Sequence, residues 1–123
     1  MNEQQFKNRT KQLGVRIIRM VDALPQGRSA DIIERQMLCS ATSVGANYRA
    51  ACRAKSSSDM INKLKIVEEE ADETLFWQES LIESELAPQA RLTELMTETD
   101  EILAMTIASL KTLRARTPTQ NKS

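Results

Sequence analysis

One segment of the chain repeats its core positions in a seven-residue pattern, which is typical of a helix packed among other helices. From residue 60 to residue 81 these positions alternate at intervals of four and three residues. They are Met60, Leu64, Val67, Ala71, Thr74, Gln78 and Leu81. Residues spaced in this way lie along one side of an α-helix and meet the side chains of neighbouring helices. Large apolar residues off this seam, such as Phe76 and Ile82, indicate that the helix is covered on more than one side.

Three other segments carry apolar residues at helical spacing, and helix breaks separate all four segments. The breaks are Pro25-Gln26-Gly27, Ser56 to Asp59, and Ala87-Pro88. We expect the first helix over about residues 4–24 and the second from Ser29 or Asp31 to the serine break. The third should run from that break to about Glu85, and the fourth from Pro88 to shortly before Pro118.

Four helices joined by short connections predict an all-α fold, an up-down-up-down four-helix bundle. A chain of 123 residues is enough for one domain with one core. We assign the bundle to residues 1–116 and expect the polar residues 117–123 to form a disordered tail. Ser56 is expected to cap the third helix, and either Ser29 or Asp31 to cap the second.

The middle of the second helix, from Cys39 to Asn47, consists almost entirely of small side chains. Such a helix lets a neighbouring backbone approach closely, and Gly45 removes the last obstacle. A glycine costs about 1 kcal/mol relative to alanine in a helix interior, so close packing is the natural compensation. Cys39 and Cys52 would lie about 20 Å apart on this helix, too far for a disulfide, and are expected to be reduced.

Several kinds of chemistry are excluded by composition. The chain has no histidine, which removes di-iron bundle sites, histidine-ligated haem and His-dependent triads. The acidic run Glu68 to Glu73 lies on one helix, where consecutive side chains diverge, so it is expected to be a solvated or ion-paired surface. We therefore expect no enzyme, no metal, no cofactor and no small-molecule substrate. No apolar run approaches the roughly 20 residues that span a bilayer, and the cytoplasm is the expected location.

Charge is divided along the chain, although its net value is zero. Residues 1–65 hold 12 basic and 5 acidic residues, and residues 66–123 hold 5 basic and 12 acidic ones. Arg49 and Arg53, one helical turn apart, are candidates for a phosphate-binding ridge. The complete predicted nucleic-acid-binding set is Arg16, Arg19, Arg35, Arg49, Arg53 and Lys55. The alternative is that Arg49, Arg53 and Lys55 pair with carboxylates of the third helix, within the bundle or across a subunit boundary.

Five residues are expected to serve packing or assembly: Gly45, Asn47, Tyr48, Phe76 and Trp77. Tyr48 is expected in the core with its hydroxyl at the rim. Asn47 is expected to form hydrogen bonds with nearby polar side chains or a facing helix. Because Phe76 and Trp77 are neighbours, both cannot face the centre of the bundle, and one is a candidate to face a partner subunit.

Several short stretches resemble a bacterial four-helix-bundle family, the 23S rRNA intervening-sequence proteins. They are Arg35-Gln36, Thr42 to Arg49 (TSVGANYR), the Ser56 to Asp59 break, Lys63 to Ile66, and Glu70 to Thr74 with Trp77. With the helical layout, the resemblance covers about residues 6–115. It implies a left-handed up-down bundle that assembles as a homopentamer around a central channel, and no established enzyme activity. A distant relative, an accessory protein to a reverse transcriptase, binds nucleic acid.

These observations favour a non-enzymatic homo-oligomeric module that offers a surface to RNA, DNA or a ribonucleoprotein partner. The alternative is a structural or protein-interaction scaffold without nucleic-acid contact. In that case the basic and acidic helices serve the assembly of subunits.

Overall fold

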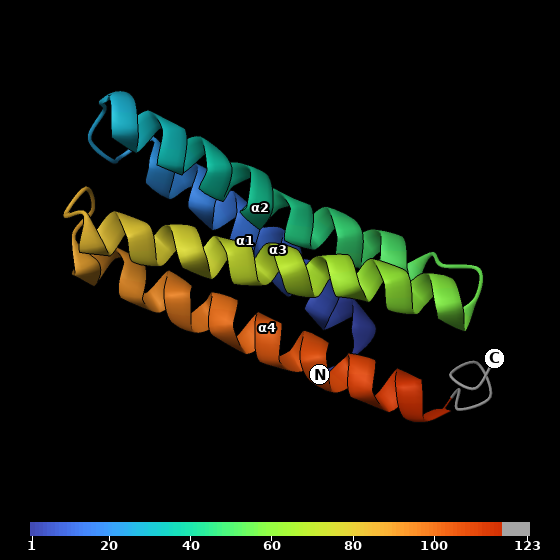
Figure 1. Cartoon of the computed structure of the whole chain (residues 1–123). Coiled ribbons are helices and arrows are strands. Elements are labelled where there is room, and N and C mark those ends of the chain that lie inside the picture. Colours follow the sequence, from blue (N-terminus) through green and yellow to red (C-terminus); the bar gives the residue numbers. More distant parts are fainter. Residues whose placement is uncertain (117–123) are drawn as a thin grey trace.

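The computed structural model describes residues 1–116 and consists of four long α-helices (Figure 1). These are α1 (Glu3–Val21), α2 (Arg28–Cys52), α3 (Ser57–Glu83) and α4 (Gln89–Arg116). The all-α prediction is confirmed. The tail predicted over residues 117–123 lies outside the described residues. None of the helices in the described part of the chain combines the length and the apolar character needed to cross a membrane.

Each helix runs antiparallel to the one before it, which gives the predicted up-down-up-down order (Figure 1). Along residues 1–116, α1 packs on α2, α2 on α3 and α3 on α4, and a thinner α1–α4 contact closes the bundle. The pairs α1–α3 and α2–α4 are therefore diagonal. It follows that the α1–α2 side and the α3–α4 side are opposite faces of the molecule.

The heptad seam predicted on the third helix is the core face of α3. Its members from Leu64 to Leu81 are fully buried, and Met60 at its end is half-buried. Two hydrogen bonds inside the core join neighbouring helices. The Thr74 hydroxyl donates to Ser40 Oγ on α2 at 2.9 Å, and Gln78 Nε2 donates to Thr99 Oγ1 on α4 at 3.2 Å. Because buried polar groups need partners, these bonds help to fix how the helices are aligned.

Two predicted helix ends differ from the structure. The second helix starts at Arg28 with Gly27 at its N-cap, and no side chain caps it, so the prediction of a Ser29 or Asp31 cap is wrong. The Asp31 carboxylate instead accepts a long 3.4 Å hydrogen bond from the Gly27 N–H. The first helix ends at Val21 rather than at Leu24. Beyond Val21 the backbone forms turns in which an N–H donates to the carbonyl three residues earlier, as Leu24 N does to Val21 O. The Ser56 cap is confirmed, since its side chain accepts from Asp59 N at 3.0 Å.

Candidate functional site

The backbones of α1 and α2 come into direct contact at two glycines. A Cβ atom built on Gly45 would lie 3.1 Å from both Lys11 Cα and Thr10 O on α1. A Cβ atom built on Gly14 would lie 3.3 Å from Thr42 Cα on α2. The structure thus puts Gly45 at the closest approach of the two helices, and any larger residue there would push α1 outward.

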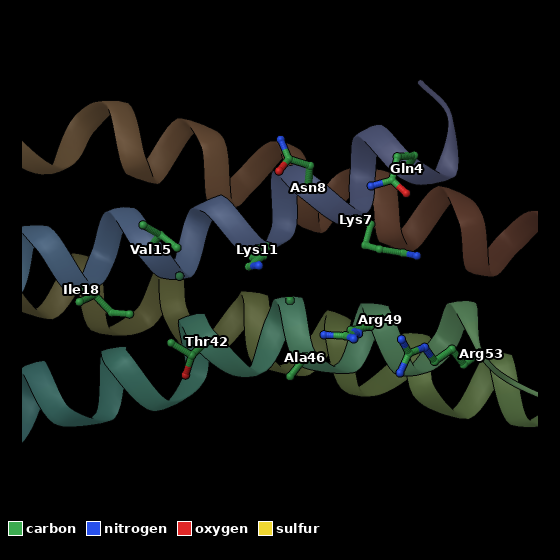
Figure 2. Close-up of a pocket in the computed structure, with 12 residues that line it drawn as sticks. Gln4, Lys7, Asn8, Lys11, Val15, Ile18, Thr42, Ala46, Arg49 and Arg53 are labelled. Carbon is green, nitrogen blue, oxygen red and sulfur yellow. The ribbon is translucent and has the colours of Figure 1, made fainter.

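On the outer surface of this contact lies a groove of about 510 Å³, which we name the basic groove (Figure 2). Its floor contains the two glycines and Ala46, so the groove is open where other helix pairs have bulky side chains. The remaining lining residues are Gln4, Lys7, Asn8, Lys11, Val15 and Ile18 from α1, and Thr42, Arg49 and Arg53 from α2.

Four cations face the space between the two helices. Lys7 and Lys11 come from α1, and Arg49 and Arg53 come from α2 (Figure 2). Within each pair the residues are one turn apart, a rise of about 6 Å along the helix. No carboxylate lines the groove, and among residues 1–116 none of the four side chains makes a hydrogen bond or an ion pair. Four like charges with no carboxylate among the lining residues make this surface an attractive site for a polyanion.

Three ion-pair contacts within residues 1–116 join α1 to α4. Arg9 forms a two-pronged contact with Glu98, through Nε at 2.6 Å and Nη2 at 2.8 Å, and also bonds Glu101. The hydrogen bond with Glu98 raises the pKa of Arg9, and Glu101 adds to this effect. Arg16 pairs with Glu94 at 3.2 Å, in a more exposed position. Basic residues of the N-terminal half of the sequence and acidic residues of its C-terminal half are therefore paired within the chain, at the thin α1–α4 contact.

The structure separates the six predicted cations. Arg49 and Arg53 line the basic groove, and in the described part of the chain neither pairs with a carboxylate of α3. Arg16 lies at the α1–α4 contact. The other three are exposed and do not line the groove: Arg19, Arg35 and Lys55.

Sequence reasoning missed the α1 half of the groove, namely Lys7 and Lys11 with the amides Gln4 and Asn8. A signal was present, because Lys7 and Lys11 have the same four-residue spacing as Arg49 and Arg53. Both pairs lie on the surface where α1 and α2 meet.

The residues predicted for packing or assembly have different surroundings. Asn47 Nδ2 donates to Ser43 O at 2.9 Å and to Ser43 Oγ at 2.8 Å on its own helix. Tyr48 is buried and meets Phe6 edge-to-face, with ring centroids 4.7 Å apart. Phe76 is 54% exposed on α3. Trp77 is half-buried, and its Nε1 donates to Glu73 at 3.3 Å.

The opposite face of the molecule carries a second, acidic groove of about 440 Å³ between α3 and α4. It is lined by Lys65, Glu68, Glu69, Asp72, Leu103 and Ile107. Glu70, also on α3, does not line this groove; burial raises its pKa, and the neighbouring Glu73 and Glu69 raise it further. Within residues 1–116 no three Asp, Glu or Cys side chains are grouped so that they could hold a metal ion.

Comparisons with known proteins agree with this architecture. Over residues 2–108 the chain matches the family described as 23S rRNA-intervening sequence protein. It is also similar to a crystal structure from Bacteroides thetaiotaomicron VPI-5482, a protein of unknown function from the S23 ribosomal protein family. The TM-score is 0.83 and the sequence identity 33%, covering 90% of this chain and 99% of the other. No curated protein matches the chain. Neither description names an enzymatic activity.

Proposed function

The chain belongs to the 23S rRNA-intervening sequence protein family, and on this premise we propose that it is a non-enzymatic module that binds nucleic acid through the basic groove. The observation that carries the proposal is the set of four cations, Lys7, Lys11, Arg49 and Arg53, which face one another with no carboxylate among the lining residues. The module is proposed to act in the cytoplasm, without a cofactor and without turnover of a small-molecule substrate.

The spacing of the cations suits the backbone of a nucleic acid. Each pair places the Cα atoms of two cationic residues about 6 Å apart along a helix, so that their long side chains can reach neighbouring phosphates of one strand. A strand in the groove would meet one row of cations on each side. Neutralising phosphates releases condensed counterions, which provides most of the affinity in binding that does not depend on sequence.

The test compares two double variants with equal changes in charge. Lys11→Gln with Arg49→Gln removes one cation from each side of the groove. Arg19→Gln with Arg35→Gln removes two exposed cations outside it. Binding of a fluorescent RNA is measured by anisotropy at a fixed salt concentration of about 0.1 M, where charges more than about 10 Å apart are screened. Circular dichroism checks that both variants are folded.

The groove variant should bind at least tenfold more weakly, because each charge-assisted contact contributes about 1.5 kcal/mol or more. The matched variant should stay within about threefold of the wild type, since distant charges are screened. Equal losses in the two variants would mean that total charge, and not the groove, determines binding.

A second candidate function is self-assembly, favoured by the acidic groove on the opposite face. Its residues Glu68, Glu69 and Asp72 complement the cations of the basic groove, and Leu103 and Ile107 add apolar surface. A contact between opposite faces of successive copies is heterologous, and such contacts form a ring where the rotation between copies closes and an open filament where it does not. The expected homopentamer would be a ring of this kind.

Charge reversal separates this candidate from the first. Arg49→Glu with Arg53→Glu should lower the mass measured by light scattering. Adding Glu68→Lys and Glu69→Lys to the same chain makes the two grooves complementary again and should restore the mass. If the arginine variant formed an oligomer of unchanged mass, the hypothesis of self-assembly through the two grooves would be rejected.

A further inference from the structure

We infer that the basic groove prefers RNA to DNA, with Gln4 and Asn8 recognising the ribose 2′-hydroxyl. This inference rests on the proposed function, because it concerns the nucleic acid held by the same groove. It makes Gln4 and Asn8 residues that determine specificity, whereas the four cations supply affinity to either kind of strand.

The two amides occupy a distinct position in the groove wall. Gln4 and Asn8 lie one turn apart on α1 and alternate along the chain with Lys7 and Lys11. Figure 2 shows Lys7 and Lys11 directed to the space between the helices, while Gln4 and Asn8 lie on the edge of α1 away from α2. Both amides are exposed, and along residues 1–116 neither side chain has a hydrogen-bond partner.

A strand whose phosphates lie between the cation rows brings its sugars against the groove walls. An amide both donates and accepts hydrogen bonds, as the 2′-hydroxyl does, whereas phosphate oxygens only accept. A deoxyribose offers no group at that position. The α2 wall carries no comparable residue, because Ala46 is apolar and the Thr42 hydroxyl already donates to Leu38 O at 2.7 Å. Recognition of the sugar is therefore assigned to the α1 wall.

The groove has neither an aromatic side chain nor a carboxylate for recognising bases. Without an aromatic residue, stacking of unpaired bases is confined to the guanidinium planes of Arg49 and Arg53. No Asp or Glu lines it to accept a hydrogen bond from a base amino group. Because arginine and amide side chains can also contact base edges, recognition of the sugar is tested with probes that carry a single kind of base.

The test uses single-stranded oligomers of uridine and deoxyuridine, equal in length and label, titrated at one low salt concentration. Because the two probes carry the same base, only the sugar differs. Three proteins are compared: the wild type, Gln4→Ala with Asn8→Ala, and the control Gln12→Ala. Gln12 is an exposed amide of α1 that does not line the groove. Gln5 is left unchanged because it forms part of the α1 cap.

The wild type should bind the ribose oligomer at least about fivefold more tightly, the change in affinity that one neutral hydrogen bond gives. The Gln4/Asn8 variant should bind both oligomers with the affinity that the wild type has for DNA, and Gln12→Ala should behave as the wild type. Equal binding of both oligomers by the wild type would overturn this inference and leave the proposed function intact. A preference for RNA that survives in the Gln4/Asn8 variant would also overturn it. Failure to bind either oligomer would reject the proposed function itself.

Discussion

The close packing of Gly45 against the backbone of α1 predicts the effect of one added methyl group. Gly45→Ala would put a Cβ atom 3.1 Å from Lys11 Cα and Thr10 O, and 3.2 Å from Lys11 N. All three atoms belong to the backbone of α1, so no flexible side chain can move aside. The helix α1 itself has to shift by a few tenths of an ångström.

Two opposing effects determine how much Gly45→Ala changes the free energy of unfolding. Alanine is favoured over glycine in a helix interior by about 1 kcal/mol. Overpacking a tight contact costs about 1–3 kcal/mol, and a rigid backbone neighbour argues for a cost near 2. The free energy of unfolding should therefore fall by about 1 kcal/mol, which corresponds to a drop of about 4 °C in Tm.

Gly14→Ala is the matched control on the other side of the same contact. Its Cβ atom would meet Thr42 Cα and Thr42 Cγ2 at 3.3 Å, so the contact is looser and one neighbour is a side chain. The gain in helix propensity should offset most of this smaller cost, and the control should lie within about 0.5 kcal/mol of the wild type. Urea unfolding followed by far-UV circular dichroism measures the free energy of unfolding of both variants. If Gly45→Ala were as stable as Gly14→Ala, the two backbones would not pack as closely as described.

Two further changes probe groups elsewhere in the bundle. Glu34 is 6% exposed, one of its carboxylate oxygens has no partner among the described residues, and burial, followed by the charge of Asp31, raises its pKa. The raised pKa means that the folded state binds a proton on the Glu34 carboxylate more tightly than the unfolded state does. Glu34 therefore lowers the free energy of unfolding as the pH rises above about 4. Glu34→Gln should thus stabilise the protein by about 1 kcal/mol at pH 7, with a smaller gain below pH 4; a gain that does not change with pH would contradict this. Arg9→Gln, which leaves Glu98 unpaired in a partly buried site, should cost about 2 kcal/mol, whereas Arg16→Gln at the exposed pair should cost less than about 0.5. Similar losses for the two arginines in thermal unfolding would show that burial does not separate the two pairs.

The fold could be predicted because its signals are local. The heptad from Met60 to Leu81 reports directly which side of α3 is buried, and helix breaks set the number of helices. The start of α2 was less predictable, because Ser29, Asp31 and Gly27 are all acceptable beginnings and the turn geometry decides among them. The pattern of apolar residues gives no information about small differences in energy between alternative turns.

The groove was harder to predict because it depends on two helices at once. The spacing of Arg49 and Arg53 is visible in the sequence, but basic residues surround α1 on several sides. Lys7 and Lys11 face α2, whereas Arg9 faces α4, and the rotation of α1 about its axis decides between them. At the glycine contact Gly45 lies against the backbone of Thr10 and Lys11, and the pattern of α1 alone does not show which of its flanks meets α2.

The slope of affinity against salt tests the central claim most directly, because it counts the phosphates that the basic groove neutralises. The logarithm of the association constant for single-stranded RNA is plotted against the logarithm of the salt concentration, for the wild type and for the Lys11→Gln, Arg49→Gln variant. Each lost phosphate contact should make the slope shallower by about 0.7, so the two lines should differ by about 1.4. Identical slopes would mean that these cations do not contact phosphate, and would contradict the assignment of the groove as a nucleic-acid site.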